Sequence, residues 1–369
     1  MNVVLVTCDQ WRADALSCAG HPVVRTPALD RLAAEGVRFA SHFGQSAPCS
    51  PGRASLYTGM YQMNTRVCTN QTPLDGRHTN FAKELRTQGY EPVLVGYTDI
   101  SADPRGVSEA DQAQHIFGTL QGLESIEPMP RAPTVGWAAW LEELGYDVPC
   151  EMFAPNEEGD MYQRGTYPSV VHEGGIAGDI TQYTTVNANG GAQFCHAVDA
   201  QGVAAAAFHK SEHSDGAYAV DLAMRHIRGR HGAPWAAHIS FFKPHPPWLA
   251  SAPFHSEYTT AAAAAVPVVR AAGDGSLEAE RAVHPFMHHI LGGASDTHAA
   301  RVAPADADEL NLLRSQYWAT CAETDAQLGR LFDFLRERGE WERTVVIFTA
   351  DHAEQLGDHW LLSKIGFRE

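Results

Sequence analysis

Short apolar runs alternate along this chain with stretches in which apolar residues recur every three or four positions. Runs of aliphatic and β-branched residues at 3–7, 92–96, 235–242 and 344–349 predict buried strands. Strands that alternate with helices in this way are typical of a parallel sheet with helices on both faces. We therefore expect an α/β fold with a mostly parallel central sheet.

The helices are predicted from their periodicity and from their ends. Apolar residues recur at helical spacing from Leu310 to Leu335, which predicts a long helix over residues 310–338. Thr26 and Pro27 suit the N-cap and first turn of a second helix, which a glycine ends after residue 35. Further helices are expected at 51–57, 80–88 and 220–228.

Two regions lack a clear pattern. Residues 100–215 are rich in Gly, Pro and Ser, and residues 255–305 resemble a surface excursion. We expect both to be irregular insertions around the site of a single domain that spans residues 1–369. The sequence ends abruptly at residues 364–369 and nothing closes the last unit, so the domain is predicted to be truncated at its C-terminus, with reduced stability and activity.

The charge and the cysteines narrow the function classes. The chain holds 27 Lys and Arg against 44 Asp and Glu, a net charge of −17, which argues against nucleic acid or an anionic membrane as a partner. Its first apolar run lacks the charged start of a signal peptide, and no run is long enough to cross a membrane. The seven cysteines show no metal-like spacing, which favours reduced thiols and a cytoplasmic location.

Four candidate metal ligands follow predicted strands. Asp9 and Gln10 come after the strand at 3–7, and Asp351 and His352 come after the strand at 344–349. Ligands of open α/β sheets bind at the carboxyl ends of strands, so we expect the four side chains to meet there. Oxygen ligands with one imidazole suit Ca²⁺, Mg²⁺ or Mn²⁺. The alternative for any single carboxylate is a helix cap or a surface charge.

Cys49 is the candidate nucleophile. Pro51 favours the first turn of a helix, so Cys49 would lie at a helix N-terminus, where an anion is stabilised. Arg53, one turn later, could bridge and orient the nucleophile. The alternatives are a buried structural cysteine, or a thiolate phosphatase, in which the arginine would lie further downstream.

The remaining candidates are histidines and a lysine. His245 lies between prolines in the loop after the strand at 235–242, which makes it an oriented group, and Lys364 is a weaker candidate alone. Other histidines could be taken for metal ligands, but they have no carboxylates at suitable spacing in the sequence, so we interpret them as structural. These are His209, His213, His284, His288 and His289.

The segment from Cys49 to Gly59 reads C-x-P-x-R followed by an apolar residue and Thr-Gly, and it resembles the sulfatase signature of the alkaline phosphatase superfamily. DQWRAD at 9–14, TPALDRL at 26–32 and TADHAEQLGDH at 349–359 are similar to other sulfatase motifs. Asn70 with PLD at 73–75, GYT at 96–98, KPHPP at 243–247 and LLSKIG at 361–366 are most similar to phosphonate monoester hydrolases, sulfatase relatives that also cleave phosphodiesters and sulfate esters. The resemblance is good over 1–100, 235–255 and 310–366.

The resemblance implies an alkaline phosphatase-like fold, one divalent metal ion, and a formylglycine produced from Cys49 by a maturation enzyme. It implies a small anionic ester as substrate and a further C-terminal portion that covers the site. It leaves a homo-oligomer open. The implied roles are metal binding by Asp9, Gln10, Asp351 and His352, contact with the transferred group or leaving oxygen by Asn70, Tyr97, His245 and Lys364, and support of the nucleophile by Arg53.

Two residues depart from the pattern of the family. Ala353 replaces the glycine common after the Asp-His pair, and Asp99 stands where these hydrolases carry a threonine near the substrate. An added carboxylate at residue 99 would alter the preference among anions. A phosphomonoesterase of the same superfamily and a catalytically silent, anion-binding fragment remain the competing hypotheses.

Overall fold

A computed structural model describes residues 1–100, 103–106, 119–128, 135–146, 182–185, 195–198, 207, 209–230, 232–246, 248–270, 272–292 and 300–364. In these residues, a central sheet has the strand order β3-β2-β6-β1-β8. All four strand pairs in it are parallel, as predicted. The strands are β1 (Asn2–Cys8), β2 (Val93–Gly96), β3 (Glu124–Pro128), β6 (Ala236–Phe241) and β8 (Thr344–Ala350).

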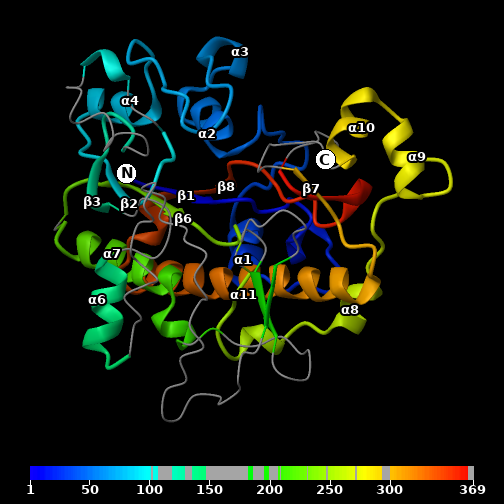
Figure 1. Cartoon of the computed structure of the whole chain (residues 1–369). Coiled ribbons are helices and arrows are strands. Elements are labelled where there is room, and N and C mark those ends of the chain that lie inside the picture. Colours follow the sequence, from blue (N-terminus) through cyan, green and yellow to red (C-terminus); the bar gives the residue numbers. More distant parts are fainter. Residues whose placement is uncertain are drawn as a thin grey trace.

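Helices cover both faces of the central sheet, which confirms the predicted α/β architecture (Figure 1). One layer contains α1 (Pro27–Glu35), α7 (Asp215–Arg228) and α11 (Ala307–Glu337). On the opposite side lie α2 (Cys49–Thr58), α3 (Gln62–Thr65) and α4 (Phe81–Thr87).

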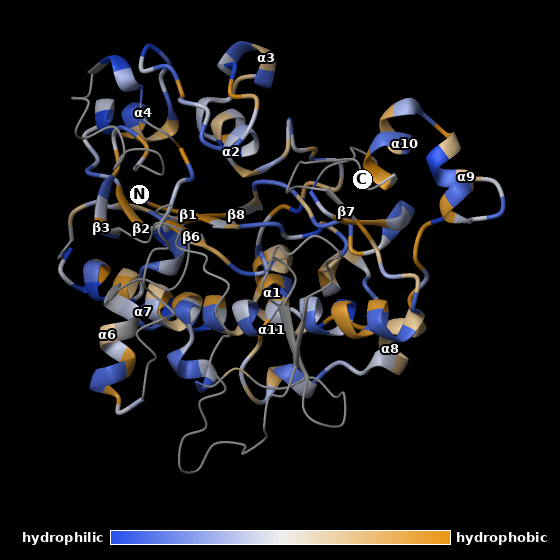
Figure 2. Cartoon of the chain, in the orientation of Figure 1, coloured by the Kyte–Doolittle hydropathy of each residue, from blue (hydrophilic) through white to orange (hydrophobic). Residues whose placement is uncertain are grey.

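The long helix α11 supports the first layer. Its apolar side chains pack beneath the sheet, and Figure 2 shows orange residues on the strands and between the layers. Asp306 caps its start by accepting the Asp308 and Glu309 amides, so it begins three residues before the predicted range. Ser214 caps α7 in the same way, which explains why α7 also begins earlier than predicted.

The start of α1 is stabilised from a distant part of the chain. Thr26 occupies the N-cap as predicted, but in the described structure its hydroxyl makes no cap bond and instead contacts Ser17. The Asp325 carboxylate, from the middle of α11, accepts the Ala28 and Leu29 amides at 2.9 Å each. α1 is therefore capped by tertiary structure, which its local sequence does not reveal.

Smaller elements occur in the two regions without a clear sequence pattern. Residues 100–215 contain α6 (Val135–Glu143) and an antiparallel pair, β4 (Gln182–Thr185) with β5 (Cys195–Val198). Residues 255–305 contain α8 (Thr260–Ala264), α9 (Leu277–Ala282), α10 (Pro285–Leu291) and β7 (Ala300–Val302). β7 pairs with β9 (Leu361–Ser363), which brings the last described residues back to the body of the domain.

The outer strand β8 is less covered than the strands beside it. Val345 and Ile347 are exposed by 41% and 47%, whereas every residue of β6 is buried. Among the described residues, no helix combines the length and apolar character that a membrane crossing requires.

Candidate active site

The candidate site lies where the carboxyl ends of four parallel strands meet the N-terminus of α2. Asp9 follows β1, Asp351 follows β8, Tyr97 follows β2, and the loop with His245 follows β6. Adjacent parallel strands end at the same edge of the sheet, so side chains more than 300 residues apart in sequence come together there.

Cys49 lies at the centre of this site and is almost fully buried. Its Sγ lies 3.0 Å from Lys364 Nζ, 3.2 Å from His352 Nε2 and 3.7 Å from Asp9 Oδ1. Burial raises the pKa of this thiol, the charge of Asp9 adds to the rise, and Lys364 offsets only part of it. Without a metal ion beside it, the unmodified Cys49 thiol is therefore held in its neutral form, which is a weak nucleophile.

Arg53 joins the two candidate metal-binding carboxylates. Its side chain is fully buried, and its guanidinium donates from Nε to Asp351 Oδ2 at 2.8 Å and from Nη2 to Asp9 Oδ2 at 3.2 Å. The guanidinium also lies 4.3 Å from the Tyr97 ring centroid and bonds Ser240 Oγ at 2.9 Å. These contacts orient both carboxylates; a direct role toward the nucleophile stays a prediction.

The pKa values of the Asp9 and Asp351 carboxyl groups are shifted in opposite directions. Burial alone would raise the pKa of Asp9, but the polar and cationic groups around it, His245, Lys364 and Arg53, hold that pKa well below its usual range. Burial raises the pKa of Asp351, and the negative charge of Asp9 adds to the rise. A metal cation beside Arg53 would favour the ionised form of both Asp9 and Asp351.

The donor set fits a divalent cation. Ligand atoms of Asp9, Cys49, Asp351 and His352 all lie within 4.8 Å of one another, and all four residues are buried. The Gln10 side-chain oxygen is also buried and lacks a hydrogen-bond partner among the described residues, while its amide nitrogen donates to the Glu354 carboxylate. Carboxylate and amide oxygens with one imidazole suit a hard or borderline ion. Burial lowers the pKa of His352, which keeps its imidazole neutral as a metal ligand must be.

His245 and Lys364 form a hydrogen-bonded pair next to Cys49. Lys364 Nζ donates to His245 Nε2 at 2.9 Å, and His245 Nδ1 lies 2.7 Å from the Pro246 carbonyl. Burial and the charge of Lys364 lower the pKa of His245 well below its usual range. Burial would also lower the pKa of Lys364, but the Cys49 sulfur, which accepts its hydrogen bond, and the charge of Asp9 outweigh this and raise it. The lysine therefore carries the proton and the histidine is neutral.

The three predicted substrate-binding residues surround the first turn of α2. Asn70 Oδ1 accepts the Ser50 amide at 3.0 Å, and Asp99 Oδ2 accepts the Ser50 hydroxyl at 2.9 Å. The Tyr97 hydroxyl donates to the Asp9 carboxylate and accepts from Arg53 at 3.0 Å. The structure thus brings all the predicted site residues to one end of the sheet; their roles stay predictions.

Gly52 allows α2 to approach the Asp351 turn closely. A Cβ atom at residue 52 would lie 2.6 Å from the Asp351 carbonyl oxygen and 2.9 Å from that of Ser46. Real Cβ atoms do not approach carbonyl oxygens so closely, so a side chain there would separate the Cys49 helix from the metal-ligand turn.

Comparison with known proteins agrees with this geometry. The sequence profile described as Sulfatase matches residues 1–368. The chain belongs to the sulfatase family. This sulfatase-family chain is 35% identical over 380 residues to the multifunctional alkaline phosphatase superfamily protein PehA of Trinickia caryophylli, covering 99% of itself and 65% of that protein.

Two solved structures resemble this family member closely. The phosphonate monoester hydrolase of Agrobacterium radiobacter has a TM-score of 0.78 and 34% identity, with 100% of this chain and 66% of that chain covered. The phosphonate monoester hydrolase SpPMH of Silicibacter pomeroyi has a TM-score of 0.73 and 28% identity, with 98% and 64% covered. The chain therefore spans slightly less than two thirds of the length of these relatives.

Some residues of this sulfatase-family site were not found from the sequence. Glu354 is fully buried, accepts the Gln10 amide and also bonds the Leu356 amide at 3.1 Å. Ser240 links Arg53 to Thr7, whose hydroxyl donates to Ser240 Oγ at 3.0 Å. Ser240 near the end of an apolar strand was a usable signal, because strand ends supplied the other site residues.

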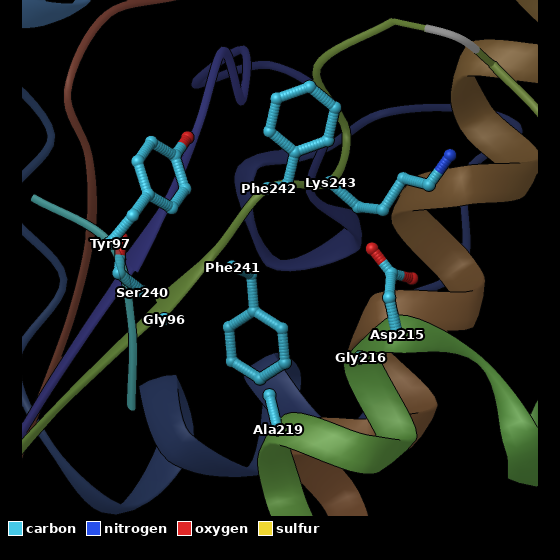
Figure 3. A pocket seen from close by; sticks show the side chains of 9 residues that line it. All are labelled: Gly96, Tyr97, Asp215, Gly216, Ala219, Ser240, Phe241, Phe242 and Lys243. Carbon is cyan, nitrogen blue, oxygen red and sulfur yellow. The ribbon is translucent and has the colours of Figure 1, made fainter. Parts of the chain in front are cut away.

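Three of the histidines interpreted as structural, His209, His213 and His284, have protein partners. His213 Nδ1 lies 2.7 Å from the Tyr146 hydroxyl, His209 Nδ1 lies 2.9 Å from Ser251 Oγ, and His284 accepts the Phe286 amide at the start of α10. Tyr97, Phe242, Lys243 and Asp215 line a separate pocket, in which the side chains of Lys243 and Asp215 point toward each other (Figure 3).

Proposed function

We propose that this chain is a metal-dependent hydrolase of sulfate esters or of phosphonate monoesters and phosphodiesters, with a nucleophile derived from Cys49. The observation that carries the proposal is the position of Cys49. In a chain matched by the sulfatase profile over residues 1–368, its Sγ lies 3.0 Å from a lysine and within a cluster of candidate metal ligands. The relatives named as phosphonate monoester hydrolases support the substrate class.

Asp9, Gln10, Asp351 and His352 would hold the metal ion, which we propose to be Ca²⁺ or Mn²⁺, with Mg²⁺ as the alternative. The ion would neutralise charge on the ester oxygens and favour ionisation of the nucleophile. Arg53 keeps the carboxylates of Asp9 and Asp351 in place, because it donates to both from one rigid guanidinium.

We propose that a maturation enzyme converts Cys49 to formylglycine. The high thiol pKa makes the unmodified side chain a poor nucleophile, so the modification supplies reactivity that the buried cysteine lacks. Once hydrated, formylglycine offers one hydroxyl that attacks sulfur or phosphorus and a second whose deprotonation expels the bound group. Asn70 binds the Ser50 amide and so fixes the first turn of α2, which orients residue 49.

Lys364 and His245 would act on the leaving oxygen. Lys364 carries a proton and contacts both Cys49 and His245, so a proton can pass from this pair to the departing alkoxide. The Tyr97 hydroxyl is held between Asp9 and Arg53, where it would keep the metal side of the site in position, and its contact with the transferred group stays a prediction.

The proposed partners follow from this chemistry. They are a small anionic ester and the maturation enzyme, acting in the cytoplasm, with neither nucleic acid nor membrane. The net charge of −17 supports the exclusion of polyanionic surfaces as partners.

The test combines mass spectrometry with a substrate panel. The chain is produced with and without a formylglycine-generating enzyme and assayed on an aryl sulfate, a phosphonate monoester, a phosphodiester and a phosphate monoester. We expect the mass of the Cys49 peptide to fall by the difference between a CH₂SH group and an aldehyde, and activity to rise with the converted fraction. Cys49→Ala should remove turnover and leave the thermal unfolding transition unchanged.

Three results would contradict the proposal. Active protein with only an unmodified thiol would exclude the formylglycine mechanism. Turnover of the phosphate monoester alone would favour the phosphomonoesterase hypothesis. Fully converted, metal-loaded protein that binds anions but cleaves nothing in the panel would favour the silent anion-binding fragment.

A further inference from the structure

Three buried polar side chains lie together on the face of the central sheet that packs against α2. Thr7 on β1 and His238 and Ser240 on β6 form this polar stripe, and none of them has more than 3% of its surface exposed. Thr7 lies opposite Ser240 in the parallel register, and His238 shares the face of Ser240 because it is two residues away in the same strand. Ile239, between them, points to the apolar core on the other face. Burial of polar groups costs free energy unless they are hydrogen-bonded, so the polar stripe needs partners.

Hydrogen bonds connect the polar stripe to Arg53. The Thr7 hydroxyl donates to Ser240 Oγ at 3.0 Å, and His238 Nε2 lies 3.0 Å from the Thr7 hydroxyl oxygen. Arg53 Nη1 donates to the same Ser240 oxygen at 2.9 Å. A hydroxyl has only one proton to donate, so Thr7 accepts from His238, which assigns the imidazole proton to Nε2. The bonds therefore run in one direction, from His238 through Thr7 to the oxygen that also binds Arg53.

His238 is held as a neutral donor at the far end of the polar stripe. Its ring contacts the rings of Tyr57 and Phe81 edge to face, with centroid separations of 5.4 and 5.6 Å. Burial lowers the pKa of His238 to about 3, and the positive charge of Arg53 adds to the fall. Its Nδ1 atom is buried without a hydrogen-bond partner among the residues that the structure describes, which agrees with a proton on Nε2. His238 thus stays a donor to Thr7 near neutral pH.

Different nitrogens of the Arg53 guanidinium bind the carboxylates and the polar stripe. Nε donates to Asp351 and Nη2 donates to Asp9. The acceptors of Nη1 are the Ser240 hydroxyl at 2.9 Å, the Tyr57 hydroxyl at 3.1 Å and the Tyr97 carbonyl at 3.3 Å. Because the guanidinium is planar and rigid, a bond that fixes Nη1 also fixes the directions in which Nε and Nη2 donate.

We propose that the polar stripe positions the Arg53 guanidinium in the orientation that serves both Asp9 and Asp351. Ser240 binds the guanidinium directly, Thr7 fixes the rotamer of Ser240, and His238 fixes that of Thr7. The consequence for metal binding rests on the proposed function, because the two carboxylates are proposed metal ligands and their orientation depends on partners behind them. Thr7 should therefore matter only while Ser240 is present, and His238 should matter least.

The variants separate positioning from a general loss of packing. Thr7→Val and Ser240→Ala remove one hydroxyl each with little change in shape, and Thr7→Ser keeps the hydroxyl. Ile239→Val is the matched control, because it lowers stability from the same strand but on the opposite face. The double variant with Thr7→Val and Ser240→Ala tests whether Thr7 acts through Ser240.

The first measurement needs neither metal nor turnover. In metal-free protein labelled with ¹⁵N-arginine, NMR follows rotation about the Cζ–Nη1 bond of Arg53, whose signals are identified by their loss in Arg53→Lys. We expect rotation to become about tenfold faster in Ser240→Ala, the effect of losing one hydrogen bond to a charged group, and about threefold faster in Thr7→Val. Thr7→Ser and Ile239→Val should match the wild type, and the double variant should match Ser240→Ala.

The second measurement is the dissociation constant for Mn²⁺, determined by calorimetry. We expect it to rise by about 3–10-fold in Ser240→Ala and less in Thr7→Val, with recovery in Thr7→Ser.

Three results would overturn the inference: unchanged Arg53 rotation in Ser240→Ala, additive effects in the double variant, or an equal effect of Ile239→Val. If Ser240→Ala does not fold, the comparison of Thr7→Val with Thr7→Ser decides alone. Failure of the proposed function would show separately, as wild-type protein that has the expected Arg53 signals but binds no Mn²⁺.

Discussion

Buried carboxylates occur in two regions of this protein, and the two groups are compensated differently. At the carboxyl ends of the strands, Asp9 and Asp351 share the guanidinium of Arg53. In the middle of α11, Asp325 accepts the two α1 amides and Glu323 Oε1 accepts the Ser251 amide at 3.3 Å. Acids with a buried cation can stay ionised, while acids that depend on neutral donors bind protons more tightly.

The pKa values reflect this difference. Burial raises the pKa of Glu323 to about 7 and that of Asp325 to about 6, against the partial relief that their hydrogen bonds give. Asp9, by contrast, has a pKa well below its usual range, because the groups around it outweigh burial, whereas burial and the charge of Asp9 raise the pKa of Asp351. The strand-end acids are therefore suited to hold a metal ion, and the α11 acids are suited to stabilise the fold.

The largest expected effect is from removing the shared cation. Arg53→Ala leaves Asp9 and Asp351 buried together without the guanidinium that bonds both, so we expect the free energy of unfolding to fall by about 3–5 kcal/mol and turnover to disappear. Urea denaturation and an aryl sulfate assay measure the two effects. Arg53→Lys keeps the positive charge but cannot donate to both carboxylates at once. We therefore expect it to recover more of the free energy of unfolding than of the turnover. A loss below about 1 kcal/mol in Arg53→Ala would contradict this electrostatic account.

The next test compares one acid from each region. Asp351→Asn should lower the affinity for Mn²⁺ and the turnover together, by about 10–100-fold, since it removes a charged ligand. The matched change Asp325→Asn should leave the Mn²⁺ content unaltered. Elemental analysis and calorimetry provide the readouts. Equal metal content in wild type and Asp351→Asn would mean that the ion binds elsewhere.

A pH series then tests the α11 acids. The pKa of Glu323 is raised from 4.5 to about 7, so the native state binds this proton more tightly than the unfolded chain between those values. Its contribution is therefore fully present below the unfolded pKa and is lost as pH rises through about 7, by at most about 3 kcal/mol. The drop in melting temperature from acidic to neutral pH should be smaller in Glu323→Gln. An identical pH profile in both proteins would refute the assignment.

The smallest expected effect concerns the cap of α1. Asp325→Ala removes the acceptor of the Ala28 and Leu29 amides, and we expect a loss of about 1–2 kcal/mol in the free energy of unfolding. Mn²⁺ affinity should not change. If metal affinity fell along with stability, the two groups of acids would not be independent.

The strands and the site motifs could be predicted because they are local patterns. Short apolar runs locate β1, β6 and β8, a period of 3.6 residues locates α11, and polar residues directly after the apolar runs locate Asp9 and Asp351. Contacts between distant residues leave no such pattern. The bridge from Arg53 to Asp351 spans 298 residues, so the sequence could place Arg53 in the site but not show what it binds.

The missed elements are short or are stabilised by distant residues. α9 and α10 have six and seven residues, too few for a period to appear, and both depend on caps from Ser276 and His284. The α1 cap is missed for the other reason: Thr26 is a good local cap residue, but the competing acceptor Asp325 comes from another helix. Glu354 was hidden because a buried acid in a polar segment resembles a solvated one.

Gly52, between Pro51 and Arg53, is a position where this chain does not tolerate a larger residue. The C-x-P-x-R pattern leaves that position open, yet here the Asp351 carbonyl oxygen lies 2.6 Å from where a Cβ would stand. The helix that begins at Cys49 and the turn that holds Asp351 and His352 are consequently packed as one unit, in which neither can shift without the other. Gly52 has no part in the proposed chemistry, yet the space between two backbone segments leaves no room for a side chain at this position.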